Sequence, residues 1–180
     1  MSLDKKINVL GVEISDDARN ILSSNNIKSY KNIDEISTLN KFDIIRLNWS
    51  LEHVHSPSKY FEFINSHLSN YGIAIICVPN NDGLIYKINK SCLELPIHLF
   101  HFDIKSLKKY SEKFKLNVSE FKTFSYPSMY AFAEEISLIP KKYKFSKMSL
   151  NEAYNFMHSH KILDDIGLGN DLMVILKKGN

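Results

Sequence analysis

The clearest pattern along the chain is a short apolar run that ends abruptly in polar and aromatic residues. Ile44, Ile45 and Leu47 form this run, which is typical of a strand buried on both faces within a parallel sheet. The loop Asn48-Trp-Ser-Leu-Glu-His-Val54 follows at once. Because ligands of open α/β sheets bind beyond the carboxyl ends of the strands, we expect this loop to form part of a functional site.

Strand and helix patterns alternate along much of the chain. Ser15, Ser56 and Asp103 each precede a segment with helical periodicity and can begin its first turn. Apolar strands are expected at residues 7–14, 42–48, 73–78, 116–124 and 171–178. This spacing is that of parallel crossover units, and it predicts an α/β fold.

Residues 126–167 interrupt this alternation. Two apolar helical stretches, at about 128–139 and 149–166, are joined there by the basic run Lys141–Lys147. We interpret their apolar side chains as packing residues and the basic run as solvated surface. Since 180 residues suffice for one core and no repeat or linker divides them, we predict a single domain over residues 1–180 with a helical insertion at about 126–167.

The composition limits the classes of partner and the location. The net charge of +3 comes from basic residues scattered among acidic ones, so we expect no nucleic-acid partner. Cys77 and Cys92 lack the spacing of a zinc site or a disulfide framework, which predicts a reduced, cytoplasmic protein. No stretch reaches the roughly 18 uninterrupted apolar residues of a membrane span, so we expect no membrane partner either.

Four segments, taken in order, resemble the class I S-adenosylmethionine-dependent methyltransferases, and in particular their small-molecule branch. They are the strand Ile7–Ser15 with its acidic end, the loop Leu51-Glu-His-Val54, the turn and strand Leu68–Asn80 ending in Val-Pro-Asn, and the loop Pro96-Ile-His-Leu-Phe-His-Phe102. The resemblance implies a Rossmann-like methyltransferase sheet that is mainly parallel with a late antiparallel strand.

The N-terminal structural unit of that family has no counterpart among the four matching segments. It consists of a strand, a Gly-x-Gly-x-Gly turn whose backbone amides hold the cofactor, and a helix. Only Met1–Lys6 precede the strand at Ile7, and the one Gly-x-Gly, Gly167-Leu-Gly169, is interpreted as a plain turn. We therefore expect a truncated methyltransferase-like domain, with the first strand and helix missing and with weak or absent binding of S-adenosylmethionine.

The resemblance also implies residues for the adenosine half of the cofactor. Glu13 stands where an acidic residue accepts bonds from the ribose hydroxyls, with a surface carboxylate as the alternative. Ile14 and Ile33 match positions on either side of the adenine ring. Asn32 stands where an aspartate usually bonds the adenine amine, so the match at that position is imperfect.

Further residues are implied for the methionine half and for catalysis. Asn48 and Trp49 match positions beside the methionine part, and a packing role for Trp49 is equally open. His53 and His98 are the candidate general bases, because an imidazole with an unperturbed pKa near about 6.5 can take a proton from an oxygen nucleophile. For His53 a purely structural role is the alternative.

The sequence predicts no metal site. His98 and His101 are three residues apart and can chelate an ion, but a coordination shell needs further ligands. Asp103 is the only carboxylate that the neighbouring sequence offers.

Two functions from different classes stay open. One is methyl transfer from S-adenosylmethionine to a small-molecule acceptor, with an oxygen nucleophile and with activity impaired by the missing glycine turn. The other is a non-catalytic remnant of a methyltransferase that serves as a binding or interaction module. A sheet without its first strand leaves backbone groups and apolar surface uncovered, so we expect a homodimer or a second chain that supplies the missing unit.

Overall fold

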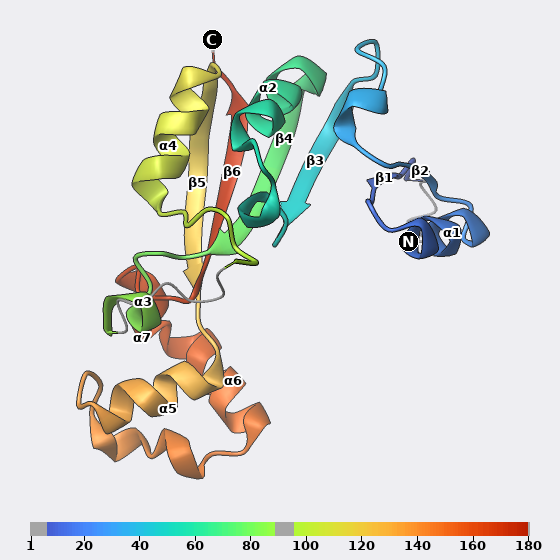
Figure 1. The fold of residues 1–180 in the computed structure, drawn as a ribbon. Helices are drawn as coiled ribbons and strands as arrows, with labels where there is room; N and C mark the ends of the chain where they lie inside the picture. Colours follow the sequence, from blue (N-terminus) through green and yellow to red (C-terminus); the bar gives the residue numbers. More distant parts are fainter. Residues whose placement is uncertain (1–6, 89–95, 180) are drawn as a thin grey trace, which may run out of the picture. The chain divides into compact units, whose positions relative to one another are not determined.

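The computed structural model describes residues 7–88 and 96–179 (Figure 1). The chain separates into two compact units, Met1–Lys41 and Phe42–Asn180. Cys92 lies outside the described residues. None of the described helices combines the length and the apolar character that a membrane crossing requires.

The first unit is a short β-α-β crossover. Its elements are β1 (Leu10–Val12), α1 (Asp16–Ser24), β2 (Lys28–Tyr30) and the 3₁₀ helix η1 (Ile33–Glu35). β1 and β2 pair in parallel, and α1 begins after Ser15, whose Oγ accepts the N–H of Ala18 at 3.3 Å. The predicted helix start at Ser15 is confirmed, whereas the strand is shorter than the predicted range 7–14.

The second unit is built on a four-stranded sheet with the order β3-β4-β6-β5. Its strands are β3 (Phe42–Asn48), β4 (Leu68–Pro79), β5 (Leu116–Phe124) and β6 (Asp171–Lys178). β3 is parallel to β4, and β6 is antiparallel to both β4 and β5. The last strand thus runs against the other three, which confirms the prediction of a mainly parallel sheet with a late antiparallel strand.

Two helices of this unit pack on one face of the sheet. α2 (Pro57–His67) and α4 (Ile104–Lys113) lie side by side on that face (Figure 1). The remaining helices lie in the connections and are η2 (Leu51–His53), α3 (Leu84–Ile88), α5 (Pro127–Glu135), η3 (Lys141–Tyr143), η4 (Phe145–Lys147), α6 (Leu150–His160) and α7 (Ile162–Asp165).

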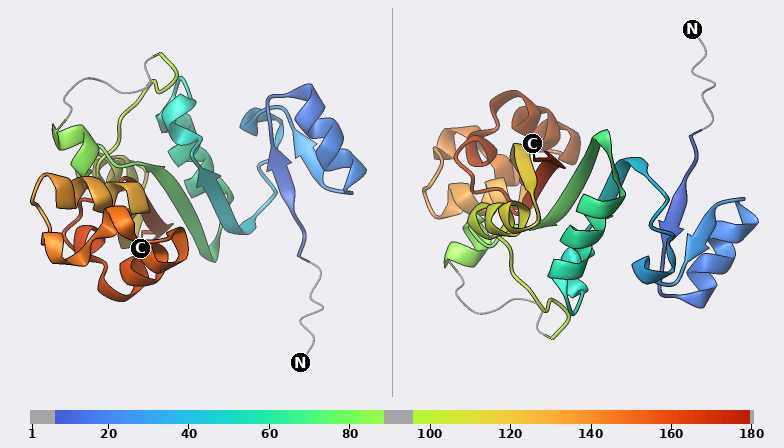
Figure 2. Two further views of the ribbon diagram at one scale, coloured as in Figure 1. Left: turned by 90° about the horizontal axis from the view of Figure 1, so that it is seen from below. Right: turned by 90° about the horizontal axis from the view of Figure 1, so that it is seen from above.

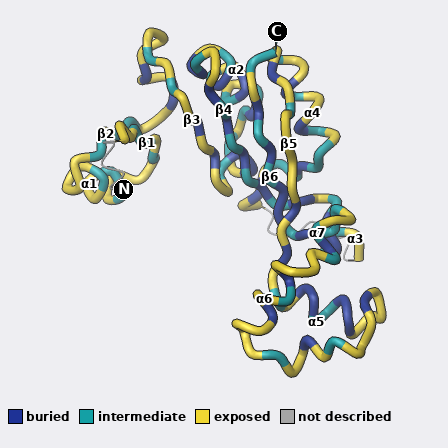
Figure 3. The backbone as a smooth tube through the Cα atoms, turned by 180° about the vertical axis from the view of Figure 1, so that it is seen from behind, coloured by how far each residue is buried: buried dark blue, intermediate teal, exposed yellow. Residues whose placement is uncertain are grey.

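The burial of β3 follows from this one-sided arrangement. Ile45 and Leu47 are buried in the core, whereas Ile44 is 61% exposed and Arg46 is exposed. Figure 3 shows the sheet from the opposite side, with α2 and α4 behind the strands. The prediction of a strand covered on both faces is therefore wrong within this unit, because its own helices cover one face only.

The main core lies between the sheet and these two helices. Phe61 of α2 and Leu107 of α4 are fully buried against Ile76 of β4 and Val174 of β6. These residues have the apolar periodicity expected for one helix face and one sheet face. The core therefore holds the carboxyl ends of β3 and β4 in a fixed position.

A capping box begins α4. The Asp103 carboxylate accepts the N–H of Ser106 at 2.6 Å, and the Ser106 hydroxyl accepts the N–H of Asp103 at 3.0 Å. Burial acts to raise the pKa of the Asp103 carboxyl, but the bonds from Ser106 outweigh burial and leave the pKa below its ordinary value. The predicted helix start at Asp103 is confirmed.

The segment between β5 and β6 is helical and forms most of a second core cluster, which also includes Leu84 of α3. Met129, Tyr130, Phe145, Met157 and Leu163 are buried there. The Tyr130 hydroxyl accepts the N–H of Leu163 at 3.2 Å, which joins α5 to α7. Figure 1 shows these helices at one end of the four-stranded sheet, and Figure 2 shows them gathered together.

The described residues form two separate sheets. Among residues 7–88 and 96–179, β1 pairs with β2 alone and β3 with β4 alone, so each keeps one edge without a strand partner. A strand supplied by another chain stays a prediction.

Candidate functional site

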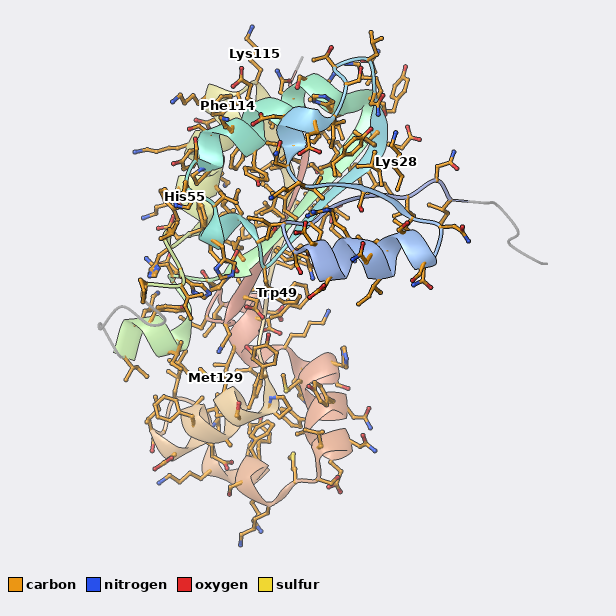
Figure 4. All side chains as sticks on the ribbon, turned by 45° about the vertical axis from the view of Figure 1, so that its right-hand side comes forward. Lys28, Trp49, His55, Phe114, Lys115 and Met129 are labelled. Carbon is orange, nitrogen blue, oxygen red and sulfur yellow. The ribbon has the colours of Figure 1, made fainter. Side chains whose placement is uncertain are left out.

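The turn after β3 carries Trp49 out of the sheet. Its backbone N–H still bonds the carbonyl of Cys77 on β4 at 2.9 Å. The φ angle of Trp49, 46°, then lies in the left-handed region, which is uncommon for a bulky residue and redirects the chain. Trp49, labelled in Figure 4, is 46% exposed as a whole residue. Trp49 therefore stands at the carboxyl end of the strand with one side open to a ligand.

Asp171, the first residue of β6, holds this indole. The Nε1–H of Trp49 donates to Asp171 Oδ1 at 3.2 Å, and the hydroxyl of Tyr126 donates to Asp171 Oδ2. Burial of Tyr126, followed by the hydrogen bond and charge of Asp171, raises the pKa of its hydroxyl to about 12. Tyr126 therefore remains a neutral donor to the carboxylate at physiological pH.

Glu52 joins the loop after β3 to the loop before α4. It lies in η2 and is 1% exposed, and its backbone carbonyl accepts the N–H groups of Leu99 at 2.8 Å and Phe100 at 3.2 Å. These bonds hold the segment after Pro96 against the turn that carries Glu52. His98 of that segment is 8% exposed.

His53 and His98 meet at this junction. Their ring centroids are 4.8 Å apart, and His53 Nε2 lies 3.8 Å from Glu52 Oε1. His53 Nδ1 lies 3.0 Å from the carbonyl oxygen of Ile97. The ring centroid of His101 is farther away, 6.3 Å from that of His98. The two candidate bases are therefore adjacent, with a buried carboxyl group beside them.

These groups line one cavity of about 320 Å³. The lining residues are Trp49, Glu52, His53, Pro79, Ile85, Tyr86, His98, Tyr126, Asn170 and Asp171. The cavity lies at the carboxyl ends of β3 and β4 and at the start of β6. This is the edge of an open α/β sheet at which ligands bind.

The first unit gathers four of the predicted residues at one edge of its own sheet. Glu13 and Ile14 follow β1, and Asn32 and Ile33 follow β2. They lie at the same edge because β1 and β2 are parallel. Glu13 Oε1 accepts the N–H of Ser15 at 2.8 Å, and a carboxylate retains acceptor capacity for further donors. Glu13 is thus suited to receive hydroxyl groups.

The other three residues offer different amounts of surface. Ile14 is 77% exposed, whereas Ile33 is 9% exposed and packs largely within the unit. The Asn32 side chain caps η1 by accepting the N–H of Asp34 at 3.0 Å, and its Nδ2 donates to Glu35 at 2.9 Å. Ile14 is therefore the apolar side chain here that is best placed to contact a ring.

Asn48 behaves differently from the other residues predicted in the second unit. It ends β3, is exposed, and its Oδ1 accepts from the guanidinium of Arg46 at 3.1 Å. Trp49, His53 and His98 line the cavity, and Asn48 is not among its lining residues.

Sequence reasoning missed Tyr126 and Asp171. Trp49 and Asp171 are separated by 122 positions, and no spacing pattern links them. The single local sign is that Asp171 is a polar residue directly before the apolar run of residues 172–176.

The sequence also indicated Asp103, rather than Glu52, as the carboxylate near His98 and His101. Asp103 is used as the N-cap of α4. Glu52 is brought to His98 by the bonds from Leu99 and Phe100 to its carbonyl, which is a tertiary contact between loops distant in sequence.

The fold, with a cavity beyond the carboxyl ends of its parallel strands, is that of the class I methyltransferases. A family model described as a methyltransferase domain matches residues 3–120. The chain therefore belongs to the methyltransferase domain family, as the sequence resemblance predicted. No curated protein sequence matches the chain.

Solved methyltransferases share this fold at low sequence identity. An S-adenosylmethionine-dependent methyltransferase from Thermotoga maritima has a TM-score of 0.61 and 16% identity, over 94% of this chain and 72% of that chain. One from Archaeoglobus fulgidus has a TM-score of 0.59 and 19% identity, over 94% and 75%. An O-methyltransferase from a multienzyme of Brevibacillus brevis, solved with S-adenosylhomocysteine, has a TM-score of 0.56 and 14% identity, over 96% and 59%.

Proposed function

We propose that the protein transfers a methyl group from S-adenosylmethionine to an oxygen atom of a small molecule. The observation that carries this proposal is the convergence of Trp49, His53 and His98 on one cavity at the carboxyl ends of β3 and β4. The fold shared with an O-methyltransferase solved with S-adenosylhomocysteine supports the choice of cofactor.

Methyl transfer from S-adenosylmethionine needs few catalytic groups from the protein. S-adenosylmethionine supplies an electrophilic methyl group on a positively charged sulfur. The protein has to align an acceptor hydroxyl with that carbon and to remove the hydroxyl proton. The new oxygen–carbon bond forms as the carbon–sulfur bond breaks, its electron pair stays on sulfur, and the proton passes to His53 or His98.

His53 is oriented for this role by its second nitrogen. The carbonyl of Ile97 can only accept, so the proton of neutral His53 lies on Nδ1 and Nε2 is the basic nitrogen. The carboxyl group of Glu52 lies beside this nitrogen, with Oε1 3.8 Å from Nε2. His98, which lies against the same ring, is the second candidate base.

Trp49, Glu13 and Ile14 are the residues that we assign to cofactor contact. The half-exposed indole of Trp49 can stack on a ligand, and Asp171 fixes its orientation. Glu13 is suited to the ribose hydroxyls and the exposed Ile14 to the adenine ring.

We also propose that the cofactor lies next to Asn32, Ile33 and Asn48. The local hydrogen bonds of Asn32 and the burial of Ile33 suit residues that shape the edge of the first unit. Asn48 is exposed beside Trp49 and has an amide to offer to the methionine part.

We expect the 180-residue chain to bind S-adenosylmethionine weakly. Its sequence has no Gly-x-Gly-x-Gly turn after a strand, and each charge-assisted bond from such a turn contributes on the order of 1.5 to 3 kcal/mol. Two missing bonds weaken binding by roughly a hundredfold or more.

Calorimetry with S-adenosylmethionine and with S-adenosylhomocysteine tests the proposal. We expect weak, saturable binding of both, further weakened by Glu13→Gln and unchanged by Asp17→Asn, a control at an exposed acidic residue four positions along. Absence of binding at the highest attainable ligand concentration would contradict the proposal and favour the alternative, a non-catalytic interaction module.

Transfer of labelled methyl groups to a panel of hydroxylated small molecules tests the catalytic roles. Because general-base catalysis contributes about 10²- to 10⁴-fold, replacement of the true base by glutamine, in His53→Gln or His98→Gln, is expected to lower kcat by that factor. His55→Gln, at an exposed histidine of the same loop, is the matched control. Equal kcat in all three variants contradicts the assignment.

A further inference from the structure

Glu52 and His53 are neighbours in the sequence, and the fold brings His98 from a later loop to join them as a set of ligand atoms. One carboxylate oxygen and one nitrogen from each ring lie within 4.8 Å of one another. Glu52 and His98 are buried, and His53 stands at the more exposed side of the group. The three side chains converge on the cavity that also contains Trp49.

The backbone holds this group in place. The carbonyl of Glu52 is bonded by the N–H groups of Leu99 and Phe100, so Glu52 and the loop carrying His98 move together. His53 follows Glu52 directly in η2. A metal site depends on ligands positioned in this way before the ion arrives.

The hydrogen bond of His53 suits a metal ligand. Its Nδ1–H donates to the carbonyl of Ile97 at 3.0 Å, so Nε2, which lies 3.8 Å from Glu52 Oε1, is the nitrogen left for a ligand. Metal-binding histidines characteristically donate their second N–H to a carbonyl or carboxylate, because this fixes the tautomer and the ring orientation. Ile97 therefore supplies the outer contact that such a site requires.

The distances require little movement. In a tetrahedral site with bonds of about 2.1 Å, ligand atoms lie about 3.4 Å apart. Glu52 Oε1 and His53 Nε2 are already 3.8 Å apart, and the largest separation in the group is within 4.8 Å. Closing the group by roughly 1 Å is within the reach of the half-exposed ring of His53.

We propose that Glu52, His53 and His98 bind one divalent ion of the zinc type. Two imidazoles and a carboxylate form a ligand set that suits Zn²⁺ or Co²⁺ better than Mg²⁺ or Ca²⁺, which prefer all-oxygen shells. Three protein ligands leave a fourth position open toward the cavity, which is the arrangement of a catalytic rather than a structural zinc site. An acceptor hydroxyl in that position loses its proton more readily.

The bound ion deepens the proposed function and changes one of its steps. A lone pair of His53 or His98 binds either a metal or a proton, so with the ion in place the hydroxyl proton passes to solvent instead of to the imidazoles. Binding of the ion itself does not depend on S-adenosylmethionine. Failure of this inference is therefore distinguishable from failure of methyl transfer.

Zinc titration of the full 180-residue chain, freed of metal and without cofactor, tests the inference by calorimetry. We expect one Zn²⁺ per chain, and visible absorption typical of a low-coordinate site when Co²⁺ replaces it. His53→Gln and His98→Gln are each expected to weaken Zn²⁺ binding on the order of 100-fold or more, since loss of even an outer contact costs about 10- to 100-fold.

His55→Gln is the matched control, because His55 is an exposed histidine of the same loop outside the ligand group. It is expected to leave Zn²⁺ binding unchanged. His53 is itself partly exposed, so His53→Gln decides the question even where replacement of the buried His98 prevents folding. Absence of Zn²⁺ binding by the wild-type chain, or equal binding by wild type and His53→Gln, overturns the inference.

A cofactor titration in the presence of a chelator separates the two proposals. Binding of S-adenosylmethionine without metal, together with no Zn²⁺ site, overturns the metal inference and leaves methyl transfer standing. A Zn²⁺ site without cofactor binding supports the metal inference and contradicts the proposed function.

Discussion

Asp171 connects two side chains that lie far from it in the sequence. It is 8% exposed and accepts the indole N–H of Trp49 and the hydroxyl of Tyr126. For a buried carboxylate, hydrogen bonds from two neutral donors replace the bonds to water that are lost on burial. Because Trp49 is the only tryptophan of the chain, its fluorescence reports directly on this contact.

Asp171→Ala is expected to loosen Trp49 and to destabilise the protein. Hydrogen bonds to charged groups contribute about 1.5 to 3 kcal/mol each, and water replaces part of the loss at the half-exposed indole, so we expect the free energy of unfolding to fall by about 2 kcal/mol. Emission of Trp49 should shift to longer wavelength and become more easily quenched by acrylamide. Asp165→Ala, at an exposed aspartate of α7, is the control. Identical emission from the two variants would contradict the role of Asp171.

At the scale of elements, α4 shows how a local motif determines where a helix begins. Asp103 and Ser106 satisfy each other's backbone N–H groups, and the helix then packs Leu107 into the core. The same helix start ends the loop that carries His98. The position of the candidate site therefore depends partly on this cap.

Asp103→Ala is expected to lower the free energy of unfolding by about 0.5 to 2 kcal/mol at neutral pH. Since the folded pKa of Asp103 is below its unfolded value, the stabilisation is present above about pH 4 and is lost as the pH falls through the folded pKa. Denaturation of wild type and variant should therefore converge at low pH.

Two further variants control this experiment. Asp103→Ser keeps a capping oxygen without the charge, so it should recover part of the stability without the pH dependence. Lys109→Ala, at an exposed position of the same helix, should have little effect. A constant difference between wild type and Asp103→Ala down to pH 2 would count against the charged cap.

At the scale of the whole molecule, the second unit leaves one face of its sheet without helices of its own. The strand register places Ile44 beside Ile73, and Ile75 beside both Arg46 and Ile175, on that face. Ile44 is 61% exposed, and the outer edge of β3 has no strand partner among the described residues. Apolar surface next to an open sheet edge favours association.

We predict that the chain associates through the region around β3, as a homodimer or with a chain that supplies a strand. Light scattering at high concentration should give a mass above 20.8 kDa. Ile44→Lys should weaken self-association by at least about tenfold, equivalent to about 1.4 kcal/mol. Asn117→Lys, the same added charge at an exposed position of β5, is the control. A clean monomer at all concentrations would contradict the prediction.

Several elements could be predicted because their signals are local. The bounds of β3 and β5 follow from apolar periodicity. The helix starts after Ser15 and Asp103 follow from side chains that cap the first turn, and the start after Ser56 follows from Pro57 at the first helical position. The membership of the methyltransferase family followed from the order of four short motifs. The exposed face of β3 was mispredicted, because an apolar run does not reveal how many layers of helices will cover it.

The chain's own sequence thus determined the order of strands and helices, the class of fold, and the candidacy of Trp49, His53 and His98. Tertiary structure alone decided which partners these residues meet. The Asp171 carboxylate reaches Trp49 across 122 positions, and Glu52 reaches His98 through bonds between two loops. Such contacts depend on how the strands are ordered in the sheet and on how the loops at its edge close. Strand order and loop closure produce no periodic pattern in the sequence, because both depend on contacts between segments that meet only when the chain folds.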